Sequence, residues 1–159
     1  MAATSIVLTE FHRKSTSWVK VLEEISSLEN KTFSEYQLPP RSFDDELKDK
    51  NNALIYLEID GDLAGYVIYS CSSSLSAVIT GLAVKENYRR RGHGEALLKA
   101  AIEKCRSKCI HRVSLHVDPL RTPAMNLYKK LGFQIDTFFK GFYSSDQDAY
   151  RMYFDLNEM

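Results

Sequence analysis

The sequence of 159 residues has little cysteine, little proline and no formal net charge, since 21 basic residues balance 21 acidic ones. Its three cysteines, Cys71, Cys105 and Cys109, are too few and too unevenly spaced for a disulfide framework. A balanced charge produces no overall field that would draw the chain to nucleic acid or to an anionic membrane. These features disfavour a disulfide-rich secreted domain, a nucleic-acid-binding module and a dedicated metal site.

Long apolar runs are scarce as well. No segment approaches the roughly 20 apolar residues of a membrane-spanning helix, and residues 1–8 lack the basic region and apolar run of a signal peptide. We therefore expect a cytoplasmic protein without membrane contact, and the run Arg89-Arg90-Arg91 is compatible with a nuclear location too. With 44% hydrophobic and 26% charged residues, the chain suits one compact core, so we expect a single domain over residues 1–159.

Apolar periodicity predicts strands and helices in mixed order along the chain. In the first half we expect a strand at residues 6–8, a helix at 18–28 ended by Glu29-Asn30-Lys31, a short helix capped by Ser42, and a hairpin of strands 53–59 and 63–69 around Asp60-Gly61. In the second half we expect a central strand at 77–84, a helix at 94–105, a strand at 112–117, a helix between the cap Thr122 and Gly132, and strands at 133–139 and 148–156 separated by a loop at 141–145.

The turn between the central strand and the next helix has the features of an anion-binding site. It reads Arg89-Arg90-Arg91-Gly92-His93-Gly94, and the helix opens at Glu95. Glycines without side chains let a diphosphate approach the backbone amides at a helix start, where the helix dipole favours negative charge. The turn lacks both the Gly-Lys-Ser/Thr of a nucleotide P-loop and the three spaced glycines of a dinucleotide fold.

Two motifs carry a resemblance to a known family. Arg89-x-x-Gly92-x-Gly94 resembles the Gln/Arg-x-x-Gly-x-Gly/Ala pattern of the GNAT acetyltransferase superfamily, and the segment from Asn126 to Phe133 resembles its Leu-Tyr-x-x-Leu-Gly-Phe segment. The resemblance implies an α/β (α+β) fold with a mixed central sheet of about seven strands and about four helices. It also implies acetyl-coenzyme A as the acetyl donor. The residues expected to bind it are Leu82, Ala83, Val84, Arg89, Arg90, Arg91, Gly92, His93, Gly94, Glu95, Arg121 and Tyr128.

Acetyl transfer to an amine needs a proton acceptor and a proton donor. By resemblance, Tyr128 is the general acid that faces the departing sulfur. Leu115-His116-Val117 resembles the Leu-His-Val segment of protein N-terminal acetyltransferases, which makes His116 the candidate base; an imidazole also titrates near neutral pH. Glu58 is a second candidate base. Some of those relatives have a tyrosine where this sequence has Ala77, and this difference weakens the transfer of roles.

The C-terminal stretch indicates the acceptor. Residues 142–152 resemble the Tyr-Tyr loop and Asp-Ala-Tyr-x-Met strand of N-terminal acetyltransferases, including the ribosomal-protein type. This resemblance implies a peptide N-terminus as acceptor and allows an auxiliary subunit as partner. The residues expected to contact the peptide are Phe33, Tyr36, Leu38, Phe142 and Tyr143. A small-molecule amine or a lysine side chain stays open as the acceptor, and so does a non-catalytic, cofactor-binding auxiliary subunit.

Overall fold

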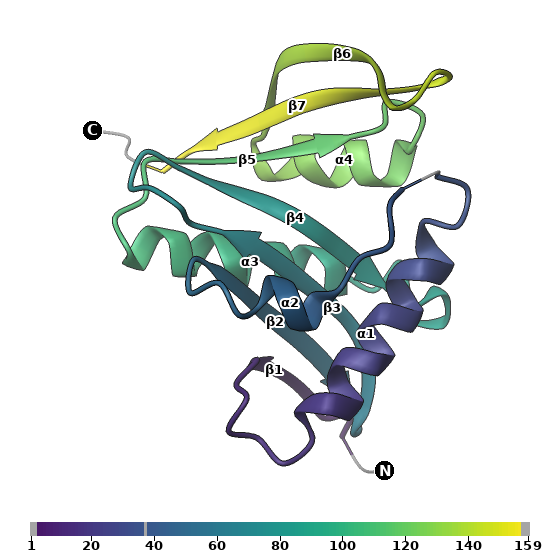
Figure 1. Cartoon of the computed structure of the whole chain (residues 1–159), viewed down its shortest axis with the longest axis vertical. Helices are drawn as coiled ribbons and strands as arrows, with labels where there is room; N and C mark the ends of the chain where they lie inside the picture. The colour runs from purple at the N-terminus through teal and green to yellow at the C-terminus, as the bar shows by residue number, and fades with distance from the viewer. Residues whose placement is uncertain (1–2, 37, 157–159) are drawn as a thin grey trace.

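The computed structural model describes residues 3–36 and 38–156, which form a seven-stranded sheet with helices on both faces (Figure 1). The strands are β1 (Ile6–Glu10), β2 (Asn52–Ile59), β3 (Asp62–Ser70), β4 (Ser76–Val84), β5 (Arg112–Val117), β6 (Gln134–Ser144) and β7 (Gln147–Asp155). Their order across the sheet is β1-β2-β3-β4-β5-β7-β6, and β4 and β5 are the one parallel pair among the described strands. The expected mixed α/β fold is confirmed.

Helices cover both faces of the sheet, so the core forms two layers. They are α1 (Trp18–Thr32), α2 (Phe43–Glu46), α3 (His93–Ser107) and α4 (Thr122–Leu131), with a single 3-10 turn, η1, at Glu86–Tyr88. The apolar stripes of α3 and α4 pack on one face of the sheet, and α1 and α2 cover the other. Strands β2 and β3 are therefore buried on both faces, which explains their nearly continuous apolar sequences. In the described part of the chain, no helix has the length and apolar character to cross a membrane.

The central pair of strands separates part-way along its length. Strands β4 and β5 pair from Ser76 opposite Arg112 to Ile79 opposite Leu115, and β4 then continues to Val84 with β3 as its strand partner. Thr80 is an extra residue in β4, because Ile79 pairs with Tyr69 and Gly81 pairs with Ile68. Beyond this bulge β4 and β5 diverge (Figure 1).

Four sequence-based boundaries were wrong. Helix α3 begins at His93, with Gly92 as its N-cap, and not at Glu95. Helix α1 continues to Thr32 through the polar residues that were expected to end it. Strand β6 extends to Ser144 with an irregular register, so the expected loop at 141–145 is mostly strand and the turn lies at residues 145–146. Helix α4 begins at Thr122, and its N-cap is Arg121. The cap on α2 is confirmed, because the Ser42 hydroxyl accepts a hydrogen bond from the Asp45 amide at 3.2 Å.

Candidate active site

The turn between β4 and α3 presents unpaired backbone amides. Gly92 is the N-cap of α3 and adopts a left-handed conformation with φ of +82°, which favours glycine because it has no Cβ. Among the described residues, no protein acceptor lies within hydrogen-bonding geometry of the N–H groups of residues 90–95. These consecutive donors lie at the positive end of a 15-residue helix, so the turn has the geometry of an anion site.

A groove of about 430 Å³ lies beside these amides. It is lined by Val84, Tyr88, Arg89, Arg90, Gly92, His93, Gly94, Glu95, Pro123, Leu127 and Lys130. A Cβ placed on Gly92 would meet no atom within 4 Å, and one on Gly94 would come no closer than 3.6 Å to Leu127. Internal packing therefore does not require these glycines, and a side chain on Gly92 would occupy open space at the turn. This arrangement fits a diphosphate approaching the backbone.

The charged residues of the turn differ in their surroundings. The Nε of Arg89 donates a hydrogen bond to the Val84 carbonyl at 2.8 Å, so this side chain holds the turn against the end of β4. Glu95 is ion-paired with Lys130 at 2.9 Å, and its pKa is lowered chiefly by this contact. Arg91 does not line the groove. The structure thus brings every other predicted residue of the turn to the groove.

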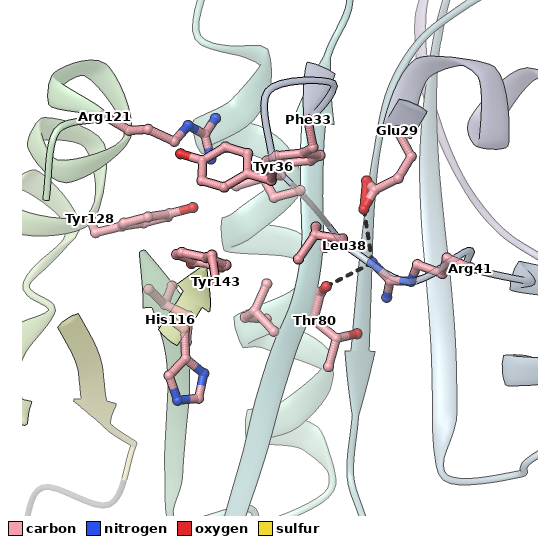
Figure 2. Close-up of a pocket in the computed structure, with 14 residues that line it drawn as sticks. Glu29, Phe33, Tyr36, Leu38, Arg41, Thr80, His116, Arg121, Tyr128 and Tyr143 are labelled. Atoms are coloured by element: carbon pink, nitrogen blue, oxygen red, sulfur yellow. Dashed lines mark hydrogen bonds and ion pairs between the residues drawn. The ribbon is translucent and has the colours of Figure 1, made fainter. Parts of the chain in front are cut away.

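A second cavity, of about 130 Å³, lies where β4 and β5 separate (Figure 2). Eight predicted site residues line it: Phe33, Tyr36, Leu38, Leu82, His116, Arg121, Tyr128 and Tyr143. Six further residues complete the lining: Glu29, Arg41, Ile79, Thr80, Gly81 and Leu115. Donor-side and acceptor-side residues that are distant in sequence therefore meet at one opening in the sheet.

Tyr128 directs its hydroxyl into this cavity from α4 (Figure 2). The side chain is only 7% exposed, and no side-chain hydrogen bond from the described residues contributes to the pKa shift of its hydroxyl. Burial raises the pKa of this phenol, and the nearby Arg121 charge opposes the shift. The hydroxyl is consequently protonated at neutral pH and free to donate its proton into the cavity.

His116 lines the same cavity from β5, but its ring is directed away from Tyr128 (Figure 2). The imidazole stacks on Phe142, with ring centroids 4.7 Å apart and an angle of 11° between the planes. Burial lowers its pKa, the charge of Arg151 adds to this effect, and Asp136 opposes it. The ring is therefore neutral at neutral pH and able to accept a proton. Phe142 supports His116 and does not itself line the cavity.

Glu58, the second candidate for the base, and Ala77, where some relatives have a tyrosine, both lie outside the cavity. Glu58 is on β2 opposite Val7 of the edge strand β1, and it lines neither the cavity nor the groove. Ala77, near the start of β4, is fully buried in the core and does not line the cavity. Among the described residues, no group of three or more histidine, cysteine or acidic side chains is arranged to hold a metal ion.

Aromatic side chains form the outer wall of the cavity. Tyr36, after α1, and Tyr143, on β6, meet edge to face with ring centroids 5.0 Å apart. The Tyr36 hydroxyl donates a hydrogen bond of 2.7 Å to the buried carboxylate of Asp118, at the end of β5. The guanidinium of Arg121 lies 5.0 Å from the ring centroid of Phe33. Two chain segments more than 100 residues apart are thus joined across the opening, as the 3.2 Å bond from the Gln147 side chain to the Glu35 carbonyl also indicates.

The sequence reading missed an ion pair in this cavity. Glu29 is only 8% exposed, its Oε1 lies 3.0 Å from Nη1 of Arg41, and its other oxygen accepts a hydrogen bond from the Tyr66 hydroxyl. One signal was present: Glu29 follows Leu22 by seven residues and Ile25 by four, so it continues the buried stripe of α1. An acidic residue in such a stripe requires a partner, because an unpaired buried charge is costly.

Comparison with known proteins identifies the family. The profile of the acetyltransferase (GNAT) family matches residues 18–133. The chain belongs to the GNAT acetyltransferase family. Members of this family are transferases, and the chain is an acyltransferase of the N-acetyltransferase type. The resemblance that its motifs indicated is confirmed.

Three relatives illustrate this membership. A Bacillus subtilis protein provisionally named as a [ribosomal protein bS18]-alanine N-acetyltransferase is 38% identical over 108 residues, which cover 65% of this chain and 69% of that one. An N-alpha-acetyltransferase of Sulfurisphaera tokodaii is 34% identical over 122 residues, covering 69% and 73%. The crystal structure of Ard1 from Thermoplasma volcanium superposes with a TM-score of 0.82 at 26% identity, covering 96% of this chain and 99% of that chain.

Proposed function

We propose that this GNAT acetyltransferase transfers an acetyl group from acetyl-coenzyme A to the α-amine at a polypeptide N-terminus. The observation that carries the proposal is the cavity between β4 and β5. The phenol of Tyr128 points into it, and an aromatic wall that includes Tyr36 and Tyr143 closes its outer side. The amide-lined groove lies at the neighbouring end of β4. The names of the Bacillus and Sulfurisphaera relatives support an α-amine as the acceptor.

The donor side of the proposal rests on backbone chemistry. The free N–H groups of residues 90–95 are suited to bind the pyrophosphate of acetyl-coenzyme A, with Arg90 and Lys130 adding positive charge at the groove. The end of β4, including Leu82, Ala83 and Val84, lacks a strand partner on its β5 side. The main-chain groups on that side, apart from the Val84 carbonyl that Arg89 binds, are suited to hold an extended arm and to polarise a carbonyl. Tyr128 and Arg121 line the cavity reached by that strand.

Acetyl-coenzyme A supplies an activated thioester. In the proposed reaction a carbon–nitrogen bond to the acceptor amine forms, and the carbon–sulfur bond breaks. Tyr128 donates the proton from its hydroxyl to the departing sulfur, because burial keeps that phenol protonated. His116 accepts the proton released by the amine as its neutral imidazole. Because the imidazole is turned from Tyr128 and stacked on Phe142, this proton transfer proceeds through a water or after a rotation of the ring.

The acceptor side suits an extended chain. The cavity lies between residues 33–36 and 38–42 on one side and the β6–β7 hairpin on the other, and Phe33, Tyr36, Leu38 and Tyr143 line it. Aromatic and aliphatic walls of this kind contact the first side chain of a peptide, and the tyrosine hydroxyls are able to bond its backbone. Phe142 contributes by supporting the His116 ring.

A thiol-release assay with three matched acceptors tests the proposal. One peptide carries a free α-amine and no lysine, the second has the same sequence with a blocked N-terminus and one internal lysine, and the third acceptor is a small diamine. We expect release of coenzyme A with the first peptide, and mass spectrometry should locate the acetyl group on its α-nitrogen. Acetylation of the lysine peptide or the diamine, with the free α-amine left unmodified, would overturn the proposed acceptor.

A further inference from the structure

Arg41 connects three elements at the edge of the cavity (Figure 2). Its Nη1 lies 3.0 Å from Oε1 of Glu29 on α1 and also 3.0 Å from the Thr80 carbonyl on β4. Its Nε and Nη2 bind the two carboxylate oxygens of Glu46 on α2, at 2.6 and 2.9 Å. The guanidinium also lies 4.7 Å from the ring centroid of Phe43. One side chain thus joins both helices of this face to the central strand.

The contact with β4 depends on two local features of that strand. The bulge at Thr80 leaves this residue without a partner in β3, and its carbonyl accepts a hydrogen bond from Arg41. The next residue, Gly81, leaves room for the guanidinium, since a Cβ there would lie 3.2 Å from Nη1 of Arg41 and 2.8 Å from Ile68. The planar, five-donor guanidinium satisfies acceptors in several directions at once, which an ammonium group does less well.

Residues 33–36 and 38–42 are therefore held at two places on opposite sides of the opening. Near their end, Arg41 bonds to Thr80 on β4. Near their start, Tyr36 bonds to Asp118 at the end of β5. Leu38, which lines the cavity, lies between these attachments, and the rings of Phe33 and Tyr143 pack against Tyr36. The amide groove at residues 90–95 shares no lining residue with the cavity that Arg41 lines.

We propose that Arg41 is a positioning residue that sets the acceptor side of the cavity. By binding Glu29, Glu46 and Thr80 together, it fixes residues 38–42 against the free edge of β4 and so holds the lining residues of the acceptor side at a set distance from Tyr128. This inference rests on the proposed transfer of an acetyl group to an amine. It extends that proposal by separating acceptor binding, which depends on Arg41, from donor binding, which does not.

The test compares Arg41→Ala with Arg13→Ala. Arg13 is a matched control. It also pairs with an acidic residue of α2, Asp44, and its guanidinium also lies over an aromatic ring, 5.1 Å from the centroid of Trp18. Unlike Arg41, it does not line the cavity. Loss of a charge-assisted contact predicts a rise of about tenfold or more in the acceptor KM for Arg41→Ala. We expect kcat and the acetyl-coenzyme A Kd, from calorimetry, to change by less than about threefold. Arg13→Ala should leave all three constants near the wild-type values.

Conservative variants separate positioning from folding. Arg41→Lys keeps the positive charge but loses the planar arrangement of donors, and Glu29→Gln keeps the side-chain shape but loses the charge. Each variant should have a near-native Tm and an acceptor KM between the values of the wild type and Arg41→Ala. If Arg41→Ala does not fold, Arg41→Lys and Glu29→Gln test the inference in its place. An acceptor KM that is unchanged in all three variants would overturn the inference. An equal loss of donor and acceptor binding would also overturn it, because it would indicate a general structural role.

Failure of the inference is distinguishable from failure of the proposed acceptor. If the wild-type chain acetylates a lysine or a diamine instead of an α-amine, the acceptor proposal fails, and the Arg41 variants are measured with the amine that reacts. If no amine reacts, amide hydrogen exchange tests the positioning role of Arg41. The amides of Phe33 and Tyr36, which bond to the carbonyls of Glu29 and Phe33, should exchange faster in Arg41→Ala than in Arg13→Ala, and equal rates would refute the positioning role.

Discussion

The phenol of Tyr128 offers the sharpest test of the proposed chemistry, through the substitution Tyr128→Phe. No side-chain hydrogen bond from the described residues contributes to the pKa shift of the hydroxyl, which lies at a mostly buried site. Its removal therefore breaks no such bond, and the free energy of unfolding should change by less than about 1 kcal/mol. Loss of a positioned general acid, in contrast, reduces kcat by about 10²- to 10⁴-fold.

A second buried tyrosine provides the control for stability. The Tyr66 hydroxyl donates a hydrogen bond to the carboxylate of Glu29, so Tyr66→Phe removes a partner from a buried charge. This change should cost about 1–3 kcal/mol of unfolding free energy, a decrease of roughly 2–4 °C in Tm for each kcal/mol in a domain of this size. We therefore expect opposite results for the two variants: Tyr128→Phe should lose kcat and keep its stability, whereas Tyr66→Phe should lose stability.

The assay combines coenzyme A release at saturating substrates, calorimetric titration with acetyl-coenzyme A, and thermal unfolding. For Tyr128→Phe we expect an unchanged donor Kd alongside the reduced kcat, because the hydroxyl acts after binding. A kcat within about threefold of the wild-type value would refute the acid role. So would a fall in kcat that is fully accounted for by weaker donor binding.

Three further predictions follow from the site. Gly92→Val should raise the acetyl-coenzyme A Kd by at least about tenfold, and its left-handed φ should cost about 1–2 kcal/mol of stability; Gly94→Ala should alter the Kd by less than about threefold, since its Cβ makes only ordinary contacts. Equal Kd values for the two variants, measured by calorimetry, would contradict the amide site. If His116 is the base, kcat/KM should fall as the pH drops through a midpoint below the ordinary imidazole pKa, because burial and Arg151 favour the neutral ring. His116→Ala should abolish that acid limb, and an unchanged pH profile would exclude the role. Tyr36→Phe should raise the acceptor KM by about tenfold by freeing its ring from Asp118, and a KM equal to the wild-type value would show that this attachment is dispensable.

The turn between β4 and α3 could be predicted from sequence because its features are local. Gly92 caps a helix that begins at His93, Gly94 follows in its first turn, and the amides exposed at residues 90–95 belong to this one stretch of backbone. The same holds for α4, whose start is set by Pro123 and whose end is set by the left-handed Gly132. Such features depend on φ, ψ and missing side chains within a few residues, so no distant contact was needed to predict them.

The acceptor side depended on contacts between distant residues. Arg41 meets Thr80 across 39 positions, and Tyr36 meets Asp118 across 82. Neither pairing has a local signal, and Arg41 reads as an ordinary charged residue before a helix cap. The bulge at Thr80 and the separation of β4 from β5 also arise from the register of pairing, which periodicity along one strand does not specify.

The succession of elements, the two motifs and the amide-rich turn can be predicted from the chain alone, because each depends on adjacent residues whose backbone preferences are strong. Three features needed the packed molecule: the burial of Glu29 beside Arg41, the stacking of the His116 ring on Phe142, and the position of Tyr143 on a strand. These outcomes depend on which surfaces the packed layers leave open and which charges they enclose. They follow from the energetics of burial across the whole molecule and not from any single segment.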